Sequence, residues 1–162
     1  MTQSLKGRSV AVTGGSKGIG KGIARVFANA GAKVGIIARN QQAAEAAAKE
    51  IGHGAFGVAG DVTSKVSMEK ALAEVAKRNG GLDVLCANAG IFPPARLEEM
   101  TEAQWDEVQN TNLKGTFLSV QAAVPFLKKS DQGRIVLTSS ITGPVTGFPG
   151  WTHYGSTKAG QL

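Results

Sequence analysis

Five short apolar segments alternate with helical segments along this chain, and this alternation constrains its fold more than any other feature. The predicted strands are 9–12, 32–38, 55–59, 82–87 and 134–139. The predicted helices between them are 18–30, 41–51, 64–78, 101–110 and 112–129. This order predicts an α/β fold, a three-layer, doubly wound parallel sheet with helices on both faces. Ligands of such a sheet bind beyond the carboxyl ends of the strands, where the strand order reverses.

Polar residues suited to helix capping precede three of these helices. Asn40 is placed to cap the second helix, and either Ser64 or Thr63 is placed to cap the third. Thr101 precedes Gln104 by three residues, which is the spacing of a capping box. These residues therefore mark the starts of the three predicted helices.

The composition is that of an ordinary soluble globular protein. Of 162 residues, 42% are hydrophobic and 19% are charged, and no linker or repeat divides the chain, so residues 1–162 are expected to form a single domain. The single cysteine, Cys86, lies in an apolar strand and is expected to be a buried, reduced thiol. The N-terminal segment Met1 to Arg8 has no apolar core of signal-peptide length, and no apolar stretch is long enough to span a membrane, which favours a cytoplasmic protein without a membrane partner.

The net charge of +6 raises the question of a nucleic-acid partner. Lys and Arg are spread along the chain and do not form a basic run with interleaved aromatic residues, so nucleic-acid binding is not expected. A mildly basic surface that attracts small anionic ligands explains the charge equally well.

A glycine-rich turn joins the first strand to the first helix. Its sequence is Thr13-Gly14-Gly15-Ser16-Lys17-Gly18-Ile19-Gly20. Small residues let a pyrophosphate approach the backbone, and the following helix offers unsatisfied N–H groups and the positive end of its dipole. The turn therefore indicates a dinucleotide site, and the alternative is a tight connection between strand and helix without a ligand.

The end of the second strand bears on the choice between NAD and NADP. A carboxylate there would accept hydrogen bonds from the ribose 2′-hydroxyl of NAD and would repel a 2′-phosphate. The positions instead read Ala38-Arg39-Asn40, and Lys17 in the glycine-rich turn adds a second cation. Both cations suit a 2′-phosphate, so we predict NADP(H) as the cofactor; the alternative is that both side chains are merely solvated.

Tyr154 and Lys158 lie four residues apart, so on a helix their side chains share one face. A nearby ammonium favours the phenolate form of a tyrosine, which suits the phenol to exchange a proton with a substrate. Such a pair also occurs by chance on exposed helices. Downstream of a dinucleotide-binding turn, however, the pair indicates an oxidoreductase.

Together these residues resemble the short-chain dehydrogenase/reductase family, whose single-domain members have a Rossmann fold. The glycine-rich turn matches the cofactor motif of the family, Asp61-Val62 its motif after the third strand, and Asn88-Ala89-Gly90 its motif after the fourth. The catalytic tetrad matches Asn112, Ser140, Tyr154 and Lys158. The resemblance implies no metal, and it implies cofactor contacts from Gly14, Ser16, Lys17, Gly18, Ile19, Gly20, Arg39, Asp61, Val62, Asn88, Ala89, Gly90, Tyr154 and Lys158.

The resemblance also implies a role for each member of the tetrad. Tyr154 would be the general acid of carbonyl reduction, and Ser140 would hydrogen-bond the carbonyl oxygen of the substrate. Lys158 would hold the nicotinamide ribose and receive protons through a water anchored by Asn112. Each residue also has a purely structural explanation, since Asn112 could cap or kink the helix that it begins and Ser140 could be an ordinary hydroxyl at a strand end.

The other motifs of the family imply supporting roles. Asn88 is expected to tie adjacent strands by side-chain hydrogen bonds, while the small Ala89 and Gly90 let the cofactor ribose approach. Asp61 is expected to receive the adenine amino group.

Within the family, segments 139–143 and 154–158 look most like those of 3-oxoacyl-(acyl carrier protein) reductases, enzymes of fatty acid biosynthesis. The resulting hypothesis is NADPH-dependent reduction of a ketone, with a 3-oxoacyl thioester reduced to a 3-hydroxyacyl thioester. The alternatives are an alcohol, steroid or sugar dehydrogenase of the same family and a catalytically silent, NADP-binding regulatory protein.

Two features depart from the family pattern. Ser140 and Tyr154 are 14 residues apart, one more than is usual in the family, and we expect the extra residue within 143–150. Family members are longer than this chain, so the final strands, a helical lid and much of the catalytic helix are expected outside it. We therefore expect the activity to belong to a longer parent enzyme, a homodimer or homotetramer, and expect the fragment itself to associate poorly and to hold its catalytic pair loosely.

Overall fold

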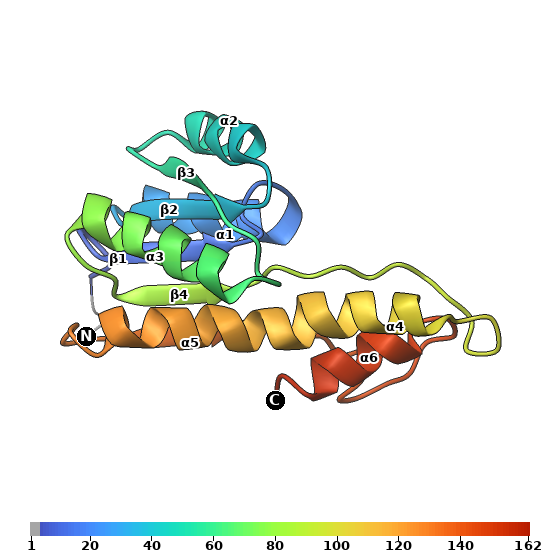
Figure 1. Ribbon diagram of the computed structural model, residues 1–162. Coiled ribbons are helices and arrows are strands. Elements are labelled where there is room, and N and C mark those ends of the chain that lie inside the picture. The colour runs from blue at the N-terminus through green and yellow to red at the C-terminus, as the bar shows by residue number, and fades with distance from the viewer. Residues whose placement is uncertain (1–3) are drawn as a thin grey trace.

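The computed structural model describes residues 4–162 and shows a parallel sheet of five strands (Figure 1). The strands are β1 (Ser9–Thr13), β2 (Lys33–Ala38), β3 (Phe56–Ala59), β4 (Val84–Ala87) and β5 (Arg134–Leu137). They lie in the order β3-β2-β1-β4-β5, and every neighbouring pair is parallel. The chain builds the sheet outward from β1 in one direction and then returns to add β4 and β5 on the other side. The doubly wound α/β fold is thus confirmed, and the strand order reverses between β1 and β4.

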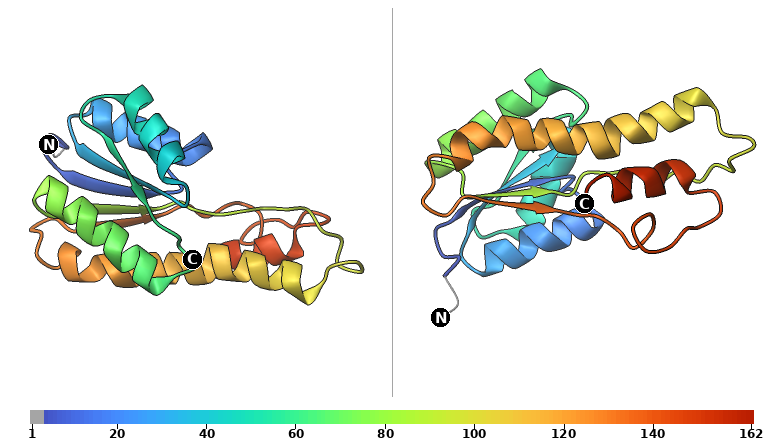
Figure 2. Two further views of the ribbon diagram at one scale, coloured as in Figure 1. Left: turned by 45° about the horizontal axis from the view of Figure 1, so that its top comes forward. Right: turned by 90° about the horizontal axis from the view of Figure 1, so that it is seen from below.

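Helices cover the two faces of the sheet and form two separate cores (Figure 2). Helices α1 (Gly18–Asn29) and α2 (Gln41–Ile51) pack on one face, and α3 (Lys65–Asn79) and α5 (Gly115–Leu127) pack on the other. Strand β1 serves both cores, because Val10 and Val12 point to the first face and Ala11 points to the second. In the described part of the chain, no helix combines the length and apolarity that crossing a membrane requires.

The predicted helix caps are present. The side chains of Asn40, Ser64 and Thr101 each accept a hydrogen bond from the backbone N–H three residues later. Of the two candidates before α3, Ser64 is the cap and Thr63 is not. Thr101 also forms the reciprocal capping box with Gln104, which fixes the start of the helix there.

Cys86 lies buried in β4. Burial raises the pKa of its thiol to about 11, because desolvation disfavours the thiolate. The predicted buried thiol is confirmed, and it stays protonated at neutral pH.

The predicted boundary between helices at residue 111 is wrong. Helix α4 (Glu102–Val108) continues through a π-helical segment, η1 (Gln109–Lys114), into α5 without leaving the helical backbone conformation, and the three form one long rod in Figure 1. Asn112 therefore lies inside a π-helical turn and does not begin a helix. Positions 101–114 contain no glycine or proline that would break the rod, and apolar periodicity does not distinguish a wider turn from a break.

The edge strand β5 also differs from expectation. It ends at Leu137, two residues before the predicted end, although the Thr138 N–H still donates to the Ala87 carbonyl oxygen at 3.1 Å. All four of its residues are exposed, whereas β1 and β4 are buried throughout. Helices therefore cover both faces of the central strands, as expected, but they leave the edge strand β5 exposed.

The last helix, α6 (Thr152–Ala159), carries Tyr154 and Lys158. It packs beside α4 and η1 and not over the sheet, and residues 138–151 connect it to β5. In Figure 1 it lies along the end of the rod that extends past the sheet. The rod thereby brings η1, which contains Asn112, next to the helix that carries the tyrosine and lysine.

Candidate active site

The glycine-rich turn closes over the carboxyl end of β1, and two of its glycines have positive φ. The φ angle is +64° at Gly14 and +54° at Gly18, a backbone region that favours glycine. A Cβ atom on Gly14 would lie 2.8 Å from the Cα atom of Ala89, so the turn touches the backbone that follows β4. The Gly14 N–H also donates to the Ile37 carbonyl oxygen at 2.8 Å. The turn is therefore fixed to both neighbours of β1.

Helix α1 packs directly against this turn at Gly20. A Cβ atom there would lie 2.3 Å from the Gly14 carbonyl oxygen and 2.5 Å from Nδ2 of Asn88. The N-cap residue Lys17 makes no side-chain capping hydrogen bond, and the first turn of α1 contains no acidic residue. The N–H groups and the positive dipole end of α1 thus lack an internal counter-ion, which is the arrangement that binds phosphate groups.

The predicted specificity residues lie at the rim of the turn. Lys17 follows β1 and Arg39 follows β2, and both side chains are exposed at the carboxyl ends of these paired strands. Ile19 is exposed as well, and Ser16 is half-buried. Asn40 is occupied by capping α2, so Lys17 and Arg39 are the charged side chains that face solvent directly after β1 and β2.

Asn88 joins the ends of β1 and β4. Its Nδ2 donates to the Thr13 carbonyl oxygen at 3.1 Å, and Oγ1 of Thr13 accepts from the N–H groups of Asn88 and Ala89, also at 3.1 Å. These are the inter-strand hydrogen bonds expected from the sequence. They hold the segment 88–90 against the glycine-rich turn.

The residues after β3 form a turn of their own. Oδ1 of Asp61 accepts hydrogen bonds from the N–H and the hydroxyl of Thr63, at 2.9 and 2.8 Å. Val62 is buried, and a Cβ atom on Gly115 would lie 2.8 Å from its Cγ2. Val62 thus anchors the turn against the start of α5, and a contact between Asp61 and adenine stays a prediction.

Asn112 is fully buried in η1 and pairs with the backbone of Ile91. Its Oδ1 accepts from the Ile91 N–H and its Nδ2 donates to the Ile91 carbonyl oxygen, both at 2.8 Å. The Nδ2 also donates to Oγ1 of Thr157 in α6 at 3.3 Å. Asn112 therefore links the segment after β4 to the helix that carries the tyrosine. A π-helical turn is rare and often marks a functional site.

Lys158 is buried, with 4% of its surface exposed. Its Nζ donates to the Thr138 carbonyl oxygen at 2.7 Å and lies 5.6 Å from the centroid of the Tyr154 ring. A Cβ atom on Gly90 would lie 3.8 Å from this Nζ and 3.2 Å from Oδ1 of Asn112. Burial lowers the pKa of Lys158, because desolvation disfavours the ammonium. The structure thus brings Tyr154, Lys158 and Asn112 together beside Gly90.

Ser140 lies in the connection between β5 and α6. It is half-buried, and its Oγ accepts a hydrogen bond from the Thr142 N–H at 3.1 Å. The preceding Ser139 instead donates its hydroxyl to the Lys158 carbonyl oxygen at 2.8 Å. A Cβ atom on Gly143 would lie 2.1 Å from the Gly155 carbonyl oxygen. The connection is therefore held against α6 on both sides of Ser140.

An aromatic cluster surrounds Tyr154, and the sequence analysis missed it. Trp151 lies 5.7 Å and Phe92 6.1 Å from Tyr154 between ring centroids, and Phe148 lies 4.9 Å from Trp151. Phe92 and Phe148 are 62% and 60% exposed. Phe148, Trp151 and Tyr154 follow one another at three-residue spacing, and Phe92 comes from the distant segment after β4. They form an accessible apolar surface beside the phenol.

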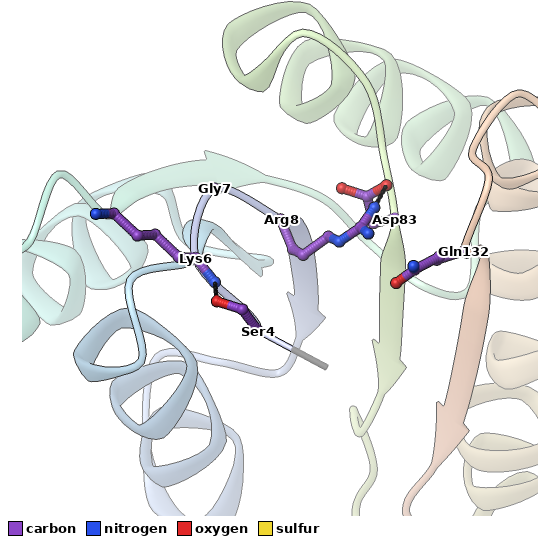
Figure 3. A pocket seen from close by; sticks show the side chains of 6 residues that line it. All are labelled: Ser4, Lys6, Gly7, Arg8, Asp83 and Gln132. Carbon is purple, nitrogen blue, oxygen red and sulfur yellow. Dashed lines mark hydrogen bonds and ion pairs between the residues drawn. The ribbon is translucent and has the colours of Figure 1, made fainter. Parts of the chain in front are cut away.

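A separate hollow at the opposite end of the strands is held together by ion pairs (Figure 3). Arg8 contacts Asp83 at 3.5 Å and Asp131 at 2.9 Å. Burial acts to raise the pKa of Asp83, but hydrogen bonds from Ser130, the Ser9 N–H and Arg8 outweigh it and leave this pKa lowered. The hollow is lined by Ser4, Lys6, Gly7, Arg8, Asp83 and Gln132. We interpret it as a structural junction between the amino-terminal ends of the strands.

Comparison with known proteins supports the same family as the motifs. The sequence model of the family described as short chain dehydrogenase matches residues 8–162. The chain is 40% identical over 159 residues to a 3-oxoacyl-[acyl-carrier-protein] reductase FabG of Staphylococcus aureus, an alignment covering 96% of this chain and 64% of the relative. It is 37% identical over 163 residues to the sorbose reductase sou1 of Schizosaccharomyces pombe, with coverage of 96% and 64%. The chain thus spans less than two thirds of the length of these curated relatives.

The fold also matches solved structures. A short chain dehydrogenase from Burkholderia cenocepacia, crystallised in complex with NADP, superposes with a TM-score of 0.90 at 34% sequence identity. The match covers 98% of this chain and 66% of that structure. The topology derived from the strand order is therefore that of a solved dinucleotide-binding protein.

Proposed function

The chain belongs to the short chain dehydrogenase family, and on this premise we propose that it serves the NADPH-dependent reduction of a ketone to a secondary alcohol. The observation that carries the proposal is the position of Lys158. Its buried Nζ lies beside the Tyr154 ring and next to the Gly90 backbone, at the sheet end where the dinucleotide turn lies. A buried cation next to a phenol suits proton transfer and serves no evident purpose in packing.

The residues present fit a dinucleotide. Gly14 and Gly20 allow the turn to pack tightly against Ala89 and Asn88, whereas a Cβ atom on Gly18 would meet no atom within 4 Å. The uncapped amino terminus of α1 begins at this open position. Lys17 and Arg39 would hold a 2′-phosphate by charge-assisted hydrogen bonds, which favours NADP(H) over NAD(H). The NADP complex of the Burkholderia relative supports this choice.

Each tetrad residue then has a defined task. NADPH, when bound, supplies a hydride to the carbonyl carbon of the substrate. The Tyr154 hydroxyl donates its proton to the carbonyl oxygen, and the Lys158 ammonium stabilises the phenolate that is left. The Ser140 hydroxyl would donate a hydrogen bond to the same oxygen as its negative charge develops. Asn112 keeps the segment after β4 in register with α6 through its bonds to Ile91 and Thr157.

We propose a 3-oxoacyl thioester as the substrate. The name of the Staphylococcus relative supports this class, and the exposed Phe92 and Phe148 offer an apolar surface for an acyl group beside Tyr154. A ketose is the second candidate, because the sorbose reductase is about as similar to this chain.

The cellular setting is also a proposal. From the family resemblance we propose a role in fatty acid biosynthesis in the cytoplasm, as a homodimer or homotetramer. Light scattering on the full natural chain measures the oligomeric state directly.

Loss of NADPH absorbance tests the function in the full natural chain. We expect turnover of acetoacetyl thioester to exceed turnover of sorbose, and we expect Tyr154→Phe to lower kcat by about 10² to 10⁴. Fluorescence titration with NADPH should show that this variant still binds the cofactor. Preferred turnover of sorbose would replace the thioester hypothesis, and cofactor binding without turnover of any ketone would favour a regulatory protein.

A further inference from the structure

Gln161 connects Lys158 to the backbone of Asn112, and no motif singles it out. It lies just beyond α6 with 8% of its surface exposed. Its Oε1 accepts a hydrogen bond from Nζ of Lys158 at 3.1 Å. Its Nε2 donates to the Asn112 carbonyl oxygen at 3.0 Å and to Oγ1 of Thr116 at 2.8 Å. One buried amide therefore bridges two members of the tetrad.

The partners of this amide permit only one orientation. The Lys158 ammonium is a donor only, so the group facing it must be the amide oxygen. The Asn112 carbonyl is an acceptor only, so the group facing it must be the amide nitrogen. Thr116 donates its hydroxyl to the same carbonyl at 2.6 Å and is therefore free to accept from Nε2. A flipped amide would place like groups against each other on both sides.

Asn112 has little capacity left for other partners. Its carbonyl oxygen accepts from Gln161 and Thr116, which uses both lone pairs. Both N–H bonds of its side-chain amide are directed at protein acceptors, one on Ile91 and one on Thr157. A side chain thus links Asn112 to the lysine, the two residues between which the family resemblance places a water.

The Lys158 ammonium is stabilised by hydrogen bonds to uncharged oxygen atoms. No carboxylate in residues 4–162 lies within ion-pair distance of its Nζ. The titratable group facing it is the phenol of Tyr154, on its own helix, whereas the segment directly after β5 contributes the Thr138 carbonyl oxygen. The Gln161 oxygen is the one side-chain acceptor recorded for this ammonium in the described part of the chain.

We propose that Gln161 is a positioning residue that keeps the Lys158 ammonium charged and fixes its place relative to Asn112. An amide donates a hydrogen bond without releasing its proton at neutral pH, so this bridge orients the ammonium and does not conduct protons. The catalytic consequence rests on the proposed function, whereas the bridge and its effect on the lysine do not.

Titration of Lys158 by NMR tests the proposal without the reaction. In the full natural chain with 13C at the lysine ε carbons and no cofactor, Gln161→Leu should lower the titration midpoint of Lys158 by about one pH unit, because it removes a hydrogen bond to a charged group. Gln161→Glu should raise the midpoint, because it places a carboxylate at the same position. In the NADPH assay, the pH at which activity declines on the alkaline side should be lower in Gln161→Leu and higher in Gln161→Glu than in the parent.

Gln109 provides the matched control. It also binds α6, donating to the His153 carbonyl oxygen at 3.2 Å and to Oγ of Ser156 at 2.7 Å, but it has no recorded contact with Lys158. Gln109→Leu should leave the midpoint unchanged. An unchanged midpoint in the Gln161 variants, or an equal shift in the Gln109 variant, would overturn the proposal. If Gln161→Leu does not fold, the shift of the Lys158 midpoint in Gln161→Glu decides the proposal alone. If the midpoint shifts as expected but the parent chain does not turn over NADPH, only the proposed function is contradicted.

Discussion

Gly143 lies in direct backbone contact with Gly155, because a Cβ atom at position 143 would be 2.1 Å from the Gly155 carbonyl oxygen. Gly155 directly follows Tyr154, so this contact sets how closely the connection that carries Ser140 approaches the catalytic helix. The φ angle of +106° at Gly143 adds a second reason for glycine at this position.

Gly143→Ala should therefore separate Ser140 from Tyr154. We expect kcat to fall by at least about tenfold, because misplaced catalytic groups lose rate steeply, while the KM for NADPH changes little. Steady-state kinetics measures both constants. Gly147→Ala in the same connection is the control, since its Cβ would meet no atom within 4 Å. Equal losses in the two variants would contradict this role of the contact.

Arg39→Asp should change the cofactor preference. The substitution removes a partner of the 2′-phosphate and adds a carboxylate that suits a ribose 2′-hydroxyl. We expect the ratio of kcat/KM with NADPH to that with NADH to fall by about 10- to 100-fold, the value of one charge-assisted hydrogen bond. Lys128→Asp changes the charge equally at an exposed position beyond α5 and should leave the ratio as it is.

Gly20→Ala should damage the dinucleotide turn. The added methyl would meet the Gly14 carbonyl oxygen, which is fixed backbone. We expect Tm to fall by roughly 5 °C and NADPH binding to weaken, since overpacking costs about 1–3 kcal/mol. Gly22→Ala, in the same helix with no atom within 4 Å of its Cβ, should leave binding intact and slightly stabilise α1. Thermal melts and fluorescence titration distinguish the two variants.

Asp83 should make stability depend on acid pH. Its pKa is lowered in the folded protein, so the folded state prefers the carboxylate form more than the unfolded state does. This contribution is complete above the unfolded pKa of about 4 and is lost as the pH falls through the lowered folded value. Urea unfolding at a series of pH values should show a difference in the free energy of unfolding between the parent and Asp83→Asn, and this difference should disappear in acid. The exposed Asp106→Asn should show no such pH-dependent difference.

The sequence predicts the sheet and its helices well because each element has a strong local signal. Buried apolar runs mark the strands, and Asn40 and Thr101 fix helix starts through hydrogen bonds within their own turn. The π-helical turn at Asn112 was not predicted, because it depends on tertiary contacts with Ile91 and Thr157 and not on local propensity.

In the candidate site, too, the residues that belong to local motifs were predicted and those that depend on distant contacts were not. Motif spacing correctly brings Tyr154 and Lys158 to one helix, and the structure places Asn112 and Gly90 beside them. Gln161 was not predicted because, although Lys158 lies three residues before it, Asn112 and Thr116 lie 49 and 45 residues away. The contacts of Phe92 with Trp151 and Tyr154 were not predicted, because these residues are distant in sequence and meet only in the folded chain.

The π-helical turn lets one continuous rod serve two different neighbours. Its α5 end contacts α3 and β4, whereas its α4 end contacts α6. A π-helical turn holds about one residue more than an α-helical turn, and each α-helical residue advances by about 100°, so the extra residue changes the azimuth of α4 relative to α5. A single deletion within Gln109–Lys114 would restore uniform winding and swing α4 away from the catalytic helix. The π-helical turn thus rotates α4 about the rod axis relative to α5, so that α5 can pack on the sheet while α4 packs on the catalytic helix.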